Sequence, residues 1–242
     1  MANKPNGNLY LIPTPIGNNS KIELPEYNIQ VINIIHHFVV EELRTARRFL
    51  KANGYIHSID ETEFFELNEH TKDIRIEDFL KPIFEGSHLG LMSEAGTPCT
   101  ADPGSIVVNY AHKMGVRVIP LVGASSILLA LIGSGLNGQQ FAFHGYIPIE
   151  KNERDKRIKE LENNAIEKDI SQIFIEAPYR NNQIFDSMVK ILQPTTHLCI
   201  ACGIYTEFEL IKTMPVKNWI KTGAPNFHKV PTVFIIGKQP NY

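Results

Sequence analysis

The sequence has few cysteines, little excess charge and no long apolar run. Cys99, Cys199 and Cys202 are its only cysteines among 242 residues, an odd and small number that argues against a disulfide framework. The formal net charge of −2 gives no bulk attraction to nucleic acid. No apolar run is long enough to span a bilayer, and the polar start MANKPNGN lacks the apolar core of a signal peptide. We therefore expect a soluble, cytoplasmic protein.

Two of the cysteines are spaced as in a C-x-x-C metal motif. They lie in HLCIACGIY, an apolar segment that is typical of a buried strand. Positions three apart on a strand face opposite sides of the sheet, so the two sulfurs cannot easily share a metal ion. We expect small apolar side chains in a core there, and no metal site.

Apolar runs and helix-like segments alternate along the chain. In the first half, strands are expected within 8–13, 31–42, 88–96 and 116–123, and helices within 41–54, 73–87, 105–115 and 124–135. This alternation predicts a mostly parallel sheet covered by helices. A second series of α/β elements begins near residue 140. The sequence therefore predicts an α/β protein with two domains, residues 1–120 and 121–242.

Three loops rich in glycine, serine and proline follow expected strands: TPIGN, SEAGTP and LVGASS. The carboxyl ends of parallel strands meet at one edge of a sheet, and open α/β sheets bind ligands beyond that edge. The three loops together therefore indicate one ligand site more strongly than any of them alone.

Four segments resemble a known family, in the same order along the chain. They are LYLIPTPIGN (9–18), LMSEAGTPCTADPG (91–104), VRVIPLVGASS (116–126) and FAFHGYIP (141–148). They are similar to motifs of the family that 2′-O-methylates a cytidine of small-subunit ribosomal RNA, within the tetrapyrrole methylase superfamily. The resemblance implies two α/β domains with a cofactor cleft between them, S-adenosylmethionine as cofactor, a homodimer, and ribosomal RNA or the small ribosomal subunit as partner.

The resemblance also implies which residues hold the cofactor. Carried over by position, they are Pro15, Gly17, Glu94, Ala95, Gly96, Thr97, Val122, Gly123, Ser125 and Ser126. Backbone N–H groups of glycine-rich loops can hold the carboxylate of the cofactor, and a carboxylate can face its sulfonium. A turn requirement explains each glycine equally well. Glu94 stands where the family has aspartate, and its carboxylate either faces the ligand or caps its own loop.

The segment EELRTARRFLKANG predicts a helix with two distinct faces. At 100° per residue, Leu43, Ala46, Phe49 and Leu50 form an apolar face. The basic residues Arg44, Arg47, Arg48 and Lys51, here called the basic stripe, fall together on another face. One interpretation is a surface that binds the phosphates of RNA. The alternative is a solvated helix face supported by nearby glutamates.

Methyl transfer to a ribose hydroxyl requires alignment of the acceptor, and a base can assist it. Family motifs suggest three candidates for that base, Glu41, Glu69 and His70. The motif residues around them match only in part, since Leu43 stands in place of a threonine.

The second half departs further from the family. Where the family has Ala-Arg-Glu-Leu-Thr-Lys, this chain has Ala201 to Thr206 without the arginine, glutamate and lysine. These losses affect the acceptor side and leave the cofactor motifs nearly intact. Two alternatives therefore stand beside ribosomal RNA methylation: a methylase of a small molecule such as a tetrapyrrole precursor, and a non-catalytic relative that binds the cofactor.

Overall fold

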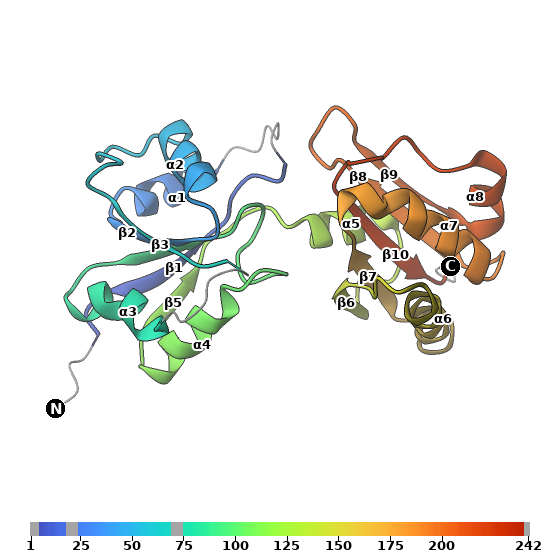
Figure 1. Cartoon of the computed structure of the whole chain (residues 1–242), viewed down its shortest axis with the longest axis horizontal. Helices are drawn as coiled ribbons and strands as arrows, with labels where there is room; N and C mark the ends of the chain where they lie inside the picture. The colour runs from blue at the N-terminus through green and yellow to red at the C-terminus, as the bar shows by residue number, and fades with distance from the viewer. Residues whose placement is uncertain (1–4, 18–23, 69–74, 240–242) are drawn as a thin grey trace. The chain divides into compact units, whose positions relative to one another are not determined.

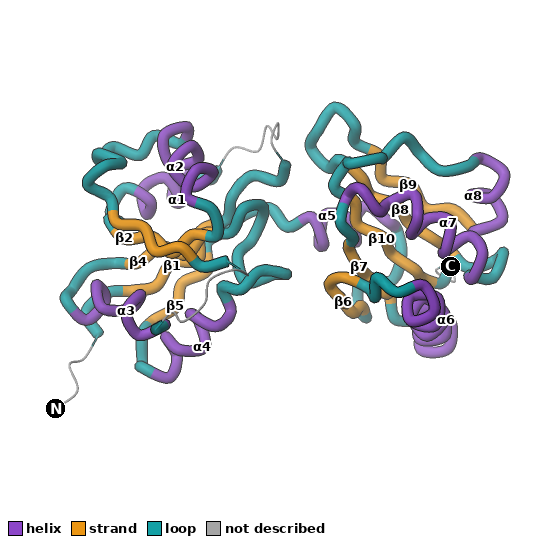
Figure 2. Tube along the Cα trace, viewed as in Figure 1, coloured by secondary structure: helices purple, strands orange, loops and turns teal. Residues whose placement is uncertain are grey.

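The computed structural model describes residues 5–17, 24–68 and 75–239. These residues form two compact units. The first runs to Ala124 apart from Gly17, which groups with the second, and the second begins at Ser125. Each unit is built around its own five-stranded sheet flanked by helices (Figures 1 and 2). The predicted α/β class with two sheets is confirmed.

The first sheet is entirely parallel. Its strands are β1 (Asn8–Ile12), β2 (His37–Val40), β3 (Glu63–Glu66), β4 (Leu89–Met92) and β5 (Arg117–Pro120), in the order β3-β2-β4-β1-β5. One face is covered by α1 (Glu26–Ile32) and α2 (Leu43–Ala52), and the other by α3 (Ile76–Phe84) and α4 (Ser105–Lys113), as Figure 1 shows.

The alternation of side chains along the central strands explains this sandwich. On β1, Tyr10 and Ile12 pack against α1 and α2, while Leu9 packs against α3 and α4. On β2, Phe38 packs on the side of α1 and α2, and Val39 packs on the side of α3 and α4. Strands with two buried faces read as continuous apolar runs, and this is how the sequence of β4, LGLM, reads.

The parallel pairing places the carboxyl ends of all five strands at one edge. Loops 13–17, 93–104 and 121–125 follow β1, β4 and β5, and β1 pairs with both β4 and β5. The prediction that the three ligand loops share an edge of the sheet is therefore confirmed.

The second sheet is mixed. Its strands are β6 (Phe141–Tyr146), β7 (Ser171–Ile175), β8 (His197–Cys202), β9 (Leu210–Pro215) and β10 (Thr232–Gly237), in the order β6-β7-β10-β8-β9. Only β6 and β7 pair in parallel. Its helices are α5 (Ser126–Ser134), α6 (Lys151–Lys168), α7 (Asn181–Ile191) and α8 (Val216–Thr222), with a short 3₁₀ turn, η1 (Pro178–Arg180).

Two separate clusters of buried side chains cover the faces of the second sheet. Helices α6, α7 and α8 pack on one face and α5 on the other. Cys202 belongs to the first cluster and Cys199 to the second, so the two sulfurs point to opposite faces. The interpretation of CIAC as part of a buried strand is confirmed.

Among the residues that the model describes, no set of histidine, cysteine, aspartate or glutamate side chains is placed to hold a metal ion. No helix within the same ranges is both long and apolar enough to cross a bilayer.

The core of the second unit gives a direct test of the fold. Phe234 is fully buried and stacks on Phe174 with ring centroids 5.4 Å apart. We expect Phe234→Ala to lower the free energy of unfolding by about 3–5 kcal/mol, because it removes apolar contacts and leaves a cavity. Trp219, the only tryptophan, lies in the same cluster, so its fluorescence during urea unfolding reports on this unit.

Phe141→Ala is the matched control for this variant. Phe141 lies on the edge strand β6 and its side chain is 42% exposed, so its removal should cost much less than the core variant. Equal unfolding midpoints for the two variants would contradict the assigned core.

Candidate functional site

The loop after β4 is fixed to the loop after β1 by paired main-chain hydrogen bonds. Thr14 N donates to Gly96 O at 2.9 Å, and Gly96 N donates to Thr14 O at 3.1 Å. The Thr14 hydroxyl adds a bond to the carbonyl of Ser93 at 3.2 Å. Two of the three predicted ligand loops are therefore held as one unit.

The backbone conformation at Gly96 and the close packing at Gly123 each require a glycine. Gly96 has φ +77°, a conformation that side-chain-bearing residues rarely adopt. A Cβ on Gly123 would lie 2.2 Å from two ring carbons of Pro13, so the third loop can approach the first only with glycine there. The structure thus supplies the turn and packing requirements that the sequence left open, without any ligand.

The second half of the β4 loop is strained and braced. Cys99 and Ala101 have φ of +67° and +64°, which is costly for residues with a Cβ. Asp102 Oδ1 accepts from Gly104 N at 2.8 Å at the start of α4. Asp102 Oδ2 is buried without a hydrogen-bond partner among the described residues. A buried carboxylate oxygen of this kind is available to a ligand or a water molecule.

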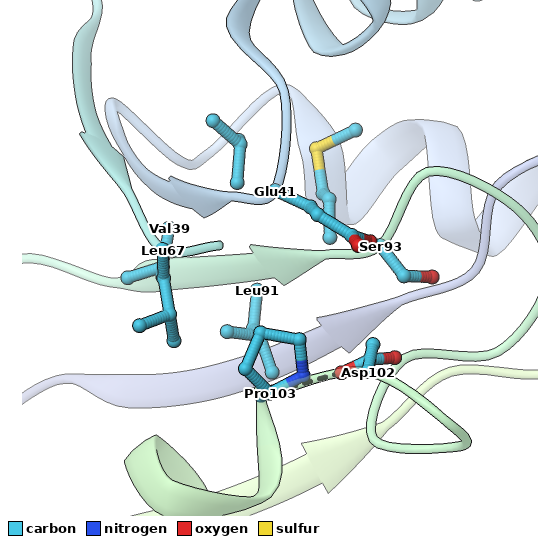
Figure 3. Close-up of a pocket in the computed structure, with 10 residues that line it drawn as sticks. Val39, Glu41, Leu67, Leu91, Ser93, Asp102 and Pro103 are labelled. Carbon is cyan, nitrogen blue, oxygen red and sulfur yellow. Dashed lines mark hydrogen bonds between the residues drawn. The ribbon is translucent and has the colours of Figure 1, made fainter. Parts of the chain in front are cut away.

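Glu41, at the end of β2, connects a further strand to the same loop. Its Oε2 accepts from Glu94 N at 3.1 Å. Glu41, Ser93 and Asp102 line a small hollow together with apolar side chains of β2 and β4. Figure 3 shows Glu41 extending toward Ser93, with Leu91 and Pro103 on the apolar side. The hollow has room for about one water molecule, so it can take no more than a small group of a ligand.

The loops carry hydrogen-bond donors that the protein does not use. The main-chain N–H groups of Ala95, Thr97, Gly123 and Ala124 donate to no residue in the described ranges. The carboxylate of Glu94 is exposed and has no hydrogen bond or ion pair within those ranges. Unused N–H groups next to a carboxylate suit a small ligand that carries both an anionic and a cationic group.

The structure places the other predicted cofactor residues as follows. Pro15, Gly17, Thr97, Ser125 and Ser126 are half-buried, and Ala95, Val122 and Gly123 are exposed. Val122 is 77% exposed, and its carbonyl accepts from the Asn28 side chain at 2.8 Å. Glu69 and His70, two of the three candidates for the base, lie outside the described residues.

The helix predicted over 41–54 is α2, and its two faces are as expected. Ala46, Phe49 and Leu50 are buried in the core of the first unit. The four cations of the basic stripe are exposed, and the guanidinium of Arg47 lies 5.4 Å from the ring centroid of Phe64. Glu42 caps the helix by accepting from Arg44 N and Thr45 N at 2.9 and 2.6 Å, and these bonds lower its pKa.

Some residues of the site were not predicted. Thr14 and Ser93 begin the predicted loops TPIGN and SEAGTP, but the hydrogen bonds through which they position these loops were not predicted. The cap formed by Glu42 has a recognisable signal, an acidic residue immediately before an apolar-periodic helix.

No protein-family model matches the chain. Curated relatives named ribosomal RNA small subunit methyltransferase I are similar over most of it. The relative from Vibrio cholerae is 29% identical over 220 residues, which are 89% of this chain and 72% of the relative. The one from Haemophilus influenzae is 27% identical, covering 97% of this chain and 80% of the relative. The one from Halalkalibacterium halodurans is 32% identical, covering 77% of this chain and 61% of the relative.

Solved structures with the same fold extend the comparison. The methyltransferase CobJ superposes with a TM-score of 0.63 at 15% identity, covering 96% of this chain and 94% of that chain. Uroporphyrin-III-C-methyltransferase from Thermus thermophilus superposes with a TM-score of 0.55 at 14% identity, covering 97% and 93%. The chain therefore shares its fold with these two solved methyltransferases, and it is similar over most of its length to the curated relatives.

Proposed function

We propose that this protein is an S-adenosylmethionine-dependent methyltransferase that 2′-O-methylates a ribose of small-subunit ribosomal RNA. The observation that carries the proposal is the set of three braced loops at one edge of the parallel sheet, in a chain whose curated relatives are named for ribosomal RNA methylation. A ribosomal substrate fits a cytoplasmic protein. The homodimer implied by the resemblance stays a prediction.

The described residues fit the proposed cofactor. The unused N–H groups of Ala95, Thr97, Gly123 and Ala124 would hold its amino-acid carboxylate, and Glu94 would face its ammonium or sulfonium. When bound, S-adenosylmethionine supplies a methyl group on a sulfonium, an electrophile that a ribose hydroxyl can attack. Apolar side chains such as Val122 and the half-buried Pro15 would exclude water around it.

Glu41 is the candidate base that lies within the described ranges, and its contacts indicate what it does. Its carboxylate already holds the β4 loop through Glu94 N, so it first fixes the loop relative to β2. From the same position it can accept a proton from an acceptor hydroxyl that reaches the hollow it lines. Glu41 therefore both positions the loop and can serve as the proton acceptor.

The basic stripe on α2 would bind the phosphates of the acceptor. Helix α2 begins directly beyond β2, so the stripe starts at the same sheet edge as the loops. Four exposed cations on one helix face attract a polyanion locally even though the whole chain has a formal net charge of −2.

Transfer of a labelled methyl group tests the activity itself. Purified protein with labelled S-adenosylmethionine should label RNA in the small ribosomal subunit, and the modified linkage should resist alkaline hydrolysis because its 2′-hydroxyl is blocked. Label that is removed by alkali, or label found only in small molecules, would contradict the proposed function. A bound cofactor without transfer to any acceptor would indicate the non-catalytic alternative.

Glu94→Gln tests the ligand-facing role of that carboxylate. We expect cofactor affinity to fall by roughly 1–3 kcal/mol, the range for a charge-assisted hydrogen bond, with the melting temperature of the free protein unchanged. Calorimetric titration measures the cofactor affinity, and thermal unfolding measures the melting temperature. Glu85→Gln, at an exposed position after α3, is the control and should change neither. A lower melting temperature with intact affinity would instead support a role within the loop.

Charge reversal tests the basic stripe. In the double variant Arg44→Glu and Arg48→Glu, affinity for ribosomal RNA and its salt dependence should fall, while cofactor affinity stays unchanged. Lys217→Glu with Lys221→Glu is the matched control, since these exposed cations have the same four-residue spacing on α8. If both double variants lose RNA affinity equally, the stripe has no special role.

A further inference from the structure

Exposed aromatic side chains of the second unit gather at one edge of its sheet. Five phenylalanine and tyrosine side chains of that unit are exposed within the described residues. Four of them lie at or beyond the ends of strands: Tyr146 ends β6, Tyr179 follows β7, and Tyr205 and Phe208 occupy the β8–β9 loop. Their exposed fractions are 61%, 66%, 48% and 56%. These four residues are called the aromatic edge below. The fifth, Phe141, lies at the opposite end of β6.

The register of the strands confirms that these positions share an edge. Tyr146 pairs with Ile175 at the end of β7, and Ile175 pairs with Val233 at the start of β10. Val233 in turn pairs with Ala201 near the end of β8. Strands β6, β7 and β8 therefore end at the same edge of the sheet, with β10 between β7 and β8, and the β8–β9 loop extends from that edge (Figure 1).

Main-chain hydrogen bonds hold the loops of this edge together. Lys229 N donates to Pro178 O at 3.1 Å, and Gly203 N donates to Pro231 O at 2.9 Å. The loop before β10 thus connects the turn that carries Tyr179 to the loop that carries Tyr205. Lys229 is exposed, and it belongs to the loop that joins the turn of Tyr179 to the loop of Tyr205.

Tyr205 and Lys229 are held in backbone conformations that their side chains disfavour. Their φ angles are +61° and +60°. Glu209 stabilises the first by accepting from Tyr205 N at 2.6 Å, and Thr206 closes the turn with a bond from its hydroxyl to Gly203 O at 2.7 Å. Strain retained in a braced and exposed loop is typical of functional positions.

We propose that the aromatic edge binds unpaired nucleotides of the RNA acceptor by stacking, with Lys229 contacting the phosphate between them. The inference rests on the proposed function and adds a second contact surface to it. Single-stranded RNA is recognised mainly by stacking of its splayed bases on aromatic side chains. Braced rings are suited to this because little conformational freedom is lost on binding.

The charges at the aromatic edge favour this occupant over a second copy of the chain. Exposed Glu207, Glu209, His228 and Lys229 are interspersed with the rings, whereas the core of a dimer interface is depleted of charge. The two carboxylates outnumber the one lysine there, so binding at this edge depends on stacking more than on phosphate attraction. The segment 202–206 contains no charged residue, and it exposes Tyr205.

Binding of an unstructured RNA of about twelve nucleotides tests the inference. In the full-length double variant Tyr179→Ala and Tyr205→Ala, the Kd should rise about tenfold to a hundredfold, with an unchanged salt slope, because stacking is lost and no charge is removed. The same RNA annealed to its complement should bind both proteins equally. Tyr179→Phe with Tyr205→Phe should retain affinity, since the rings remain.

The control is Tyr27→Ala with Phe141→Ala, two aromatic side chains exposed elsewhere, which should leave the Kd unchanged. Equal single-strand affinity of the wild type and the alanine double variant would overturn the inference. A parallel loss of cofactor affinity would assign the rings to the cofactor site, and dissociation of a dimer would assign them to a self-interface; either result also overturns it. If the wild type transfers no methyl group to RNA, the proposed function fails independently of the aromatic edge.

Discussion

Parallel pairing of the first sheet is the constraint on which the arrangement of the site depends. Because β1, β2, β4 and β5 run in the same direction, the loops that follow them emerge at one edge, although they are far apart in the sequence. The double hydrogen bond between Thr14 and Gly96 then converts two neighbouring loops into one rigid element. Glu41 adds the end of β2 through its bond to Glu94 N. Each of these hydrogen bonds can form only because the parallel strands bring the loops to the same edge.

The sequence predicted those parts of the fold that depend on local pattern. Apolar runs followed by glycine-rich loops located β1, β4 and β5, and helical periodicity located α2 with its buried and basic faces. Four of the helices and strands were not predicted, and one of them is α8. Helix α1 begins after a proline without a side-chain cap, β3 is a four-residue edge strand, and β9 alternates only weakly. The mixed order of the second sheet depends on long-range pairing, which local pattern does not encode.

The candidate site shows the same division. The resemblance indicated the loop positions, but not why each residue is there. Gly123 is required by its contact with Pro13, a neighbour that sequence distance conceals. Glu94 is exposed, so the cost of burying an unpaired carboxylate does not arise for it. Asp102 proved to have one oxygen engaged and one buried without a partner, a distinction that only coordinates can make.

The thiol of Cys99 has a consequence for a loop proposed to hold an alkylating agent. A thiolate is a far better nucleophile than a ribose hydroxyl, so a reactive cysteine there would compete for the methyl group. Burial, with the negative charge of Asp102 as a second cause, raises the pKa of Cys99 to about 11. Burial likewise raises the pKa of Cys199 to about 11 and that of Cys202 above its usual value. At neutral pH the thiol of Cys99 stays protonated, so it is a poor competitor for a methyl group held by this loop.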